Sequence, residues 1–99
     1  MIEKVNFKPK LHVLVCCNDR GPGNASCSPF IKPEDVKDIK IWIREQGLAG
    51  SVYCTRTQCL GFCNNDGSVI AIWPKGTFLK GFKNKEEIKE YLQGEFERI

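Results

Sequence analysis

The side chains in this sequence that are best suited to chemistry are its six cysteines, which fall into two groups. They are Cys16, Cys17 and Cys27 in the first group and Cys54, Cys59 and Cys63 in the second. Clustered thiols in a reducing compartment more often bind a metal or do redox work than form disulfides. The segment between the two groups has helix and strand patterns, so it predicts a scaffold that brings two distant cysteine loops together.

The spacing of Cys59 and Cys63 suits a shared ligand site. Residues at positions i and i+4 of a helical turn lie about 5–6 Å apart at Cβ, so both thiols can face one metal cluster. Gly61 lies between them and leaves the backbone uncrowded. Its amide and those beside it are therefore free to donate hydrogen bonds to cluster sulfur, which is a known control on redox potential.

Spacing alone leaves several chemistries open. The chain has no Cys-x-x-Cys, which weakens both a zinc ribbon and a thioredoxin-type dithiol, although Cys54-x4-Cys59 keeps a zinc site possible. The plant-type ferredoxin run Cys-x4-Cys-x2-Cys is absent, because three residues separate Cys59 from Cys63. Three disulfides would need an oxidising compartment, and the share of cysteine is below that of disulfide scaffolds. Iron–sulfur chemistry is favoured, with zinc, thiol redox and disulfides as alternatives.

The overall composition limits the classes of protein to which this chain can belong. Ninety-nine residues predict a single domain over 1–99. The formal net charge of +3 is small, and no dense Lys/Arg stripe with interleaved aromatics is present, so we expect no nucleic-acid partner. No apolar run of about 18 residues spans a membrane, and the charged start at Met1–Lys4 shows no secretory signal. We therefore expect a cytoplasmic protein without a membrane partner.

Hydrophobic periodicity predicts four short strands and two main helices. The predicted strands cover 11–15, 51–54, 69–73 and 77–79, and the predicted loops cover 16–29 and 55–67. One helix begins near Pro33 and ends at Gly47, and another begins after Asn84, whose side chain can cap it with Glu87 as the capping-box partner. Strand, helix and strand give a parallel pair, and a hairpin adds antiparallel strands. The expected fold is α/β and thioredoxin-like, with a four-stranded mixed sheet and two helices.

Two segments resemble the thioredoxin-like [2Fe-2S] ferredoxins. The stretch HVLVCCNDRGPG at 12–23, followed by Ser26-Cys27, is similar to the opening of that family. The stretch TQCLGFC at 57–63, followed by VIAIWPKGTF at 69–78, is similar to its second ligand loop and hairpin. The resemblance runs from about His12 to Leu92, which is most of the chain. A related domain occurs in the flavoprotein part of NADH dehydrogenases and in some hydrogenases.

The resemblance implies a set of four cluster ligands, namely Cys16, Cys27, Cys59 and Cys63. Cys17 and Cys54 match no ligand of that family, and we expect them to be small buried fillers. Strand alternation points Cys16 and Cys17 to opposite faces but does not choose between them, so that choice rests on the resemblance alone. The family often has Gly-Pro soon after the fourth cysteine, where this chain has Asn64 to Ser68, which leaves the shape of that loop open.

The function implied by the resemblance is one-electron transfer by a single [2Fe-2S] cluster. We expect the protein to have no catalytic activity. We also expect it to bind redox protein partners, such as a reductase or a hydrogenase, and to form a homodimer by analogy with the family. The alternative is a cluster-bearing or zinc-bearing accessory module of a larger redox enzyme, such as a hydrogenase or NADH dehydrogenase. A third hypothesis is a thiol–disulfide enzyme, against which the absence of Cys-x-x-Cys argues.

Overall fold

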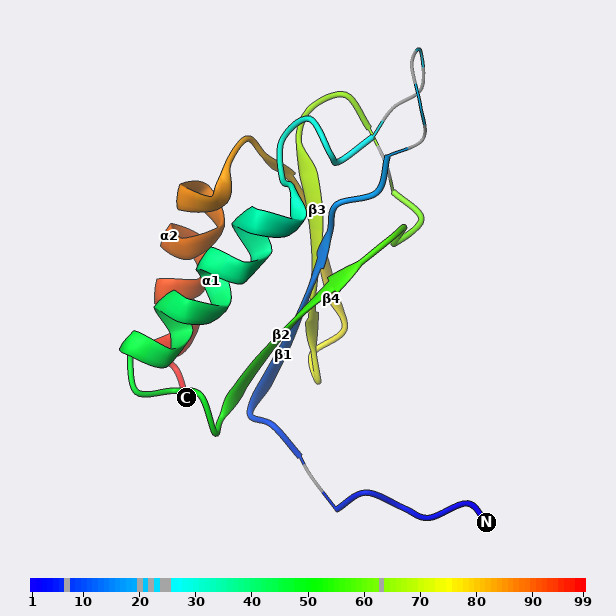
Figure 1. The fold of residues 1–99 in the computed structure, drawn as a ribbon. Coiled ribbons are helices and arrows are strands. Elements are labelled where there is room, and N and C mark those ends of the chain that lie inside the picture. Colours follow the sequence, from blue (N-terminus) through cyan, green and yellow to red (C-terminus); the bar gives the residue numbers. More distant parts are fainter. Residues whose placement is uncertain (7, 20, 22, 24–25, 63) are drawn as a thin grey trace.

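The fold is a single four-stranded sheet with two helices (Figure 1). The computed structural model describes residues 1–6, 8–19, 21, 23, 26–62 and 64–99. The elements in chain order are β1 (Leu11–Cys16), α1 (Pro33–Glu45), β2 (Val52–Thr57), β3 (Ser68–Trp73), β4 (Thr77–Phe82) and α2 (Lys85–Phe96). The strand order is β2-β1-β3-β4, with β1 and β2 parallel and the other neighbours antiparallel. The predicted α/β thioredoxin-like arrangement is confirmed.

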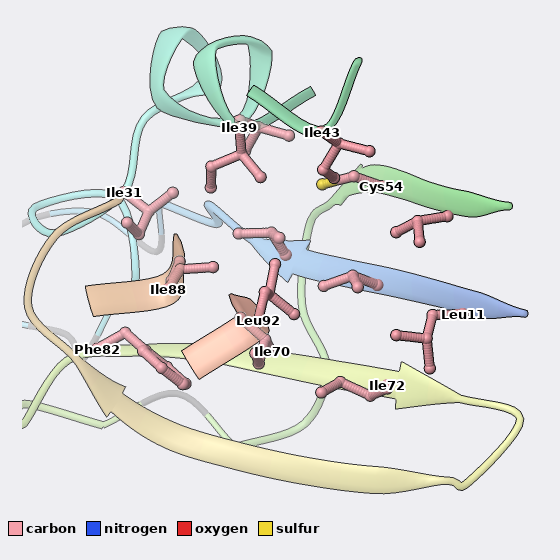
Figure 2. Packing of buried hydrophobic residues seen from close by; sticks show 14 of the residues in the cluster. Leu11, Ile31, Ile39, Ile43, Cys54, Ile70, Ile72, Phe82, Ile88 and Leu92 are labelled. Atoms are coloured by element: carbon pink, nitrogen blue, oxygen red, sulfur yellow. The ribbon is translucent and has the colours of Figure 1, made fainter. Parts of the chain in front are cut away.

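Both helices lie on the same side of the sheet, and the hydrophobic core lies between the helices and the sheet (Figure 1). Alternate residues of β1, beginning with Leu11, point to this side and are fully buried, as strand geometry requires. Ile39 and Ile43 of α1 and Ile88 and Leu92 of α2 pack onto them (Figure 2). Among the described residues, no helix covers the other face of the sheet. In the described part of the chain, no helix is long and apolar enough to cross a membrane.

Local hydrogen bonds explain where the helices begin. The backbone N–H of Lys32 donates to a carboxylate oxygen of Asp35 at 2.9 Å at the start of α1. At the start of α2, the Asn84 side chain accepts from the backbone N–H of Glu87 at 3.0 Å, which confirms the predicted cap. The Glu87 carboxylate accepts from the N–H of Lys83 rather than from Asn84, so the second half of the predicted capping box is shifted by one residue.

Two strands extend three residues beyond the ends that the sequence predicts, whereas β1 and β3 differ from the prediction by one residue. Strand β2 continues to Thr57, and β4 continues to Phe82, so the second cysteine loop begins at Gln58 instead of residue 55. The added part of β2 is polar, and its residues Thr55 and Arg56 are exposed, because β2 is an edge strand with only β1 as its neighbour. Hydrogen bonding to β1 holds it in the sheet, and a pattern of apolar residues does not report such pairing.

Because β1 and β2 are parallel, they end at the same edge of the sheet. Cys16, the last residue of β1, pairs in register with Thr57, the last residue of β2. The loops that follow these strands therefore leave the sheet side by side, at the end opposite to the N-terminus and the β3–β4 turn (Figure 1). The fold thus brings the two cysteine loops together.

Candidate metal centre

Two of the predicted ligands, Cys16 and Cys27, are brought into contact. Both side chains are fully buried in a small cluster with Val69 and Leu60, separate from the main core. The Cys27 thiol lies within hydrogen-bonding reach of the Cys16 thiol. The backbone N–H of Cys27 donates to the carbonyl of Asn18 at 3.1 Å, which folds the first loop back on the end of β1. This closure places a residue eleven positions further along the chain against Cys16.

The second cysteine loop lies directly against Cys16. The Cys16 thiol donates to the backbone carbonyl of Gln58, with Sγ to oxygen at 2.6 Å. The next residue, Cys59, is exposed, and its Sγ accepts a hydrogen bond from the N–H of Gly61 at 3.2 Å. Gly61 has a φ of +90°, a region that only glycine adopts without strain. The loop therefore turns at Gly61 so that an amide points at the Cys59 sulfur.

Burial raises the pKa of the Cys16 thiol to about 11. The neighbouring Cys27 thiol raises this pKa as well, whereas the backbone amides of Asn18 and Leu60, which donate towards the sulfur, lower it. Metals bind the thiolate form, so binding requires Cys16 to lose its proton. Amides that point at a ligand sulfur stabilise the thiolate and are typical of cysteine-ligated centres.

The donors at this end of the sheet fit a sulfur-ligated centre. Cys16 and Cys27 are in contact and the Cys59 loop is adjacent, whereas Cys63 lies outside the described residues. Within the described ranges, no three His, Cys, Asp or Glu side chains are grouped as they would be around a metal ion. The single histidine, His12, lies elsewhere and bonds Thr55 at 2.8 Å. The four-cysteine ligand set therefore remains a prediction.

Cys17 and Cys54 lie on the helix side of the sheet. Cys17 is half-buried and packs against the main core, and its thiol donates to the carbonyl of Thr57 at 3.7 Å. Cys54 is buried in the main core, beneath Ile43 of α1 (Figure 2). The structure thus separates Cys16 from Cys17, which the sequence pattern alone did not do.

The Cys54 thiol is expected to be almost unreactive in the folded protein. Burial raises its pKa to about 11, whereas an exposed thiol titrates near 8.5. Only the thiolate reacts, so alkylation at pH 8 should be about 100-fold slower than in unfolded protein. Time-resolved iodoacetamide labelling with peptide mapping measures this rate for Cys54 alone. Labelling of Cys54 at the unfolded rate would show that it is not buried.

Ser68 is a residue at this site that the sequence analysis did not identify. Its side chain is fully buried at the start of β3, and its hydroxyl donates to the backbone carbonyl of Cys16 at 2.9 Å. This bond joins β3 to Cys16, the last residue of β1 and a predicted ligand. A polar residue directly before the apolar run at 69–72 was the only available signal, and many strands begin in that way.

Ser68→Ala is expected to lower the free energy of unfolding by about 1–2 kcal/mol, because the buried Cys16 carbonyl loses a partner. Urea denaturation of the variant and of Thr77→Ala, a partly exposed hydroxyl on β4, measures the difference. An effect no larger than that of Thr77→Ala would show that the bond to Cys16 contributes nothing.

Comparison with solved structures identifies close structural neighbours. A thioredoxin-like [2Fe-2S] ferredoxin from Aquifex aeolicus, in its wild-type form, matches with a TM-score of 0.71 and 27% identity over 87% of this chain and 84% of that chain. A second structure of a thioredoxin-like [2Fe-2S] ferredoxin from that organism matches with a TM-score of 0.69 and 28% identity over 84% of this chain and 76% of that one. No family model and no curated protein matches the sequence. The resemblance seen in the sequence is thus confirmed by structure.

Proposed function

We propose that this chain is a one-electron carrier that binds a single [2Fe-2S] cluster. Its ligands would be Cys16, Cys27, Cys59 and Cys63. The contact between the Cys16 and Cys27 thiols, at the end of the sheet where the Cys59 loop meets them, is the observation that carries the proposal. The solved neighbours support it, because they are [2Fe-2S] ferredoxins, which carry electrons and are not enzymes.

The chain would bind the cluster, stabilise the negative charge on the ligand sulfurs and hold the cluster close to the surface that a partner can reach. A bound [2Fe-2S] cluster supplies one-electron redox chemistry. The amides of Asn18, Leu60 and Gly61 point at ligand sulfurs and would stabilise their negative charge. Cys16 and Cys27 lie in the interior, whereas Cys59 lies at the surface. An electron would therefore leave or enter on the side of the Cys59 loop, where a redox protein partner can approach.

The cluster itself is tested by anaerobic reconstitution with iron and sulfide. The expected product is red-brown and holds about two irons and two acid-labile sulfides per chain. Reduced protein should then pass its electron to a soluble redox protein. A colourless product that binds only zinc, at one ion per chain, would contradict the proposal and favour the zinc-bearing accessory module. A cytoplasmic setting is part of this proposal, because reducing conditions there keep thiols available to bind metal.

We also propose a homodimer, in which the face of the sheet that is not covered by helices forms the interface. Phe62, Trp73 and Phe78 are about half exposed, and their rings form a continuous row from the second cysteine loop to the hairpin. Tyr53 on β2 is exposed in the same way. Large aromatic side chains on one open face are typical of an interface between protein chains. A second copy that covers this face would bury the row.

Phe78→Glu should convert the dimer to a monomer, because it places a charge in the buried interface. Ile41→Glu is the control, since Ile41 is similarly exposed but lies on α1, away from this face. Sedimentation equilibrium gives the mass of both variants. A wild-type protein that sediments as a monomer of 11.2 kDa would contradict the dimer without affecting the cluster proposal.

A further inference from the structure

A groove runs along the outer edge of the sheet, between α1 and the edge strand β2. It consists of two adjoining hollows of about 340 Å³ and 400 Å³, and Lys40 lines both. Arg44 lines the first hollow, and Lys37 and Arg56 line the second. We call Lys37, Lys40, Arg44 and Arg56 the basic groove.

The four cations of the basic groove share one surface and are not neutralised there. The three on α1 follow the spacing i, i+3, i+7, which places them on one face of the helix. Within the described part of the chain, none of the four forms a salt bridge, whereas Lys75 and Lys85 do. One carboxylate, Glu34, also lines the groove, so positive charge is in clear excess.

Many of the acidic side chains lie on α2, away from the basic groove. Helix α2 and the residue after it carry five of the twelve acidic side chains, at positions 86, 87, 90, 95 and 97. Arg56 is the only charged residue of β2, so no acid offsets the groove from the strand side. A formal net charge of only +3 therefore conceals a strongly basic edge.

The basic groove leads to the candidate metal centre. Arg56 pairs in register with Val15, the residue before Cys16, and it lies three positions before Cys59. A partner bound along the groove would therefore contact the end of β2, from which the exposed Cys59 loop continues. Charges on such a rim accelerate encounter and orient the partner more than they add affinity.

We propose that the basic groove docks the acidic surface of a protein redox partner, an inference that rests on the proposed electron-carrier function. The groove is short and has an apolar wall that includes Ala49 and Val52. This mixture suits the rim of a protein interface, whereas nucleic acid would need a longer cationic track of phosphate contacts. Docking there would place the partner beside the cluster end of the molecule.

The test uses one redox protein in two charge forms. Native cytochrome c is basic, and succinylation of its lysines makes it acidic while keeping the haem. In each reaction, one electron passes from the reduced protein to the ferric haem, which stopped-flow absorbance follows. At low salt, the triple variant Lys37→Gln, Lys40→Gln, Arg56→Gln should reduce the succinylated form about tenfold more slowly than wild type does. High salt should remove most of this difference, because it screens exposed charges.

The matched control removes the same charge from the far end of the molecule. The triple variant Lys4→Gln, Lys8→Gln, Lys10→Gln changes the lead-in before β1, which lies opposite to the cysteine loops (Figure 1). It should reduce succinylated cytochrome c at nearly the wild-type rate. Equal slowing by both triple variants would overturn the proposal, because only net charge would then matter. Faster reduction of native than of succinylated cytochrome c at low salt, with no change in the groove variant, would overturn it as well.

Failure of the groove and failure of the electron-carrier function give different results. If the cluster assembles but the two triple variants behave alike, the groove proposal alone is wrong. If no cluster assembles, neither cytochrome c is reduced, and calorimetric titration of the purified protein with succinylated cytochrome c still tests the groove. Tighter binding in the same titration by duplex DNA, or by vesicles that contain phosphatidylserine, would overturn the choice of a protein partner.

Discussion

Cys16→Ala is expected to abolish binding of the iron–sulfur cluster. Cys16 is the residue on which the site converges, because it contacts the Cys27 thiol, the Gln58 carbonyl and the amide of Leu60. Alanine removes the sulfur that lies at the centre of these contacts. Iron bound after anaerobic reconstitution should fall at least about tenfold, and the visible absorbance of the cluster should be lost with it.

Cys54→Ala is the matched control for this substitution. It also replaces a buried cysteine by alanine, but Cys54 lies in the main core on the helix side of the sheet. Its iron content should equal that of wild type, although it should lose about 1 kcal/mol of stability from the smaller side chain. Full iron content in Cys16→Ala, or loss of iron in Cys54→Ala, would show that the ligand set is assigned wrongly.

Among the glycines, Gly67 is the one at which substitution by alanine is expected to lower stability most. A Cβ at Gly67 would lie 2.5 Å from the carbonyl carbon of Gly81 and 2.7 Å from the backbone nitrogen of Phe82. Both are backbone atoms of β4, so relief requires β3 and β4 to separate at the end that supports the second cysteine loop. The φ of +157° at Gly67 is also unfavourable for other residues.

We expect Gly67→Ala to lower the free energy of unfolding by more than about 3 kcal/mol, as measured by urea denaturation. Gly50→Ala is the control, because a Cβ there meets no atom within 4 Å and its φ is not in the left-handed region. Similar midpoints for the two variants would show that β3 and β4 do not approach each other as closely as the structure indicates.

The fold was largely predictable because apolar periodicity reports burial. The short apolar run at 11–15 corresponds to β1, and the helical spacing of Val36, Ile39 and Ile43 corresponds to residues that are buried in the structure. The ends of β2 and β4 were not predictable, since backbone pairing holds these edge strands and the added residues show no regular apolar pattern, although Phe82 at the end of β4 is buried. The second half of the capping box was also misassigned, because Glu87 reaches the amide of Lys83 instead of Asn84.

The candidate site was predictable only in part. Residue types and the family resemblance selected the cysteines, and the parallel pairing of β1 with β2 explains why their loops meet. No pattern in the sequence separates Cys16 from Cys17, because that distinction depends on which side of the sheet is covered by helices. The role of Ser68 and the basic groove depend on contacts between distant segments, which a single sequence does not reveal.

The most direct test of the central claim is the electron paramagnetic resonance spectrum of the reconstituted protein after reduction with dithionite. One [2Fe-2S] cluster on four cysteines predicts a silent oxidised protein and, after reduction, a signal that integrates to about one unpaired electron per chain. Cys54→Ala should keep this signal, and Cys16→Ala should lose it. A reduced wild-type protein that contains iron and sulfide yet gives no such signal, or that binds zinc in their place, would contradict the claim.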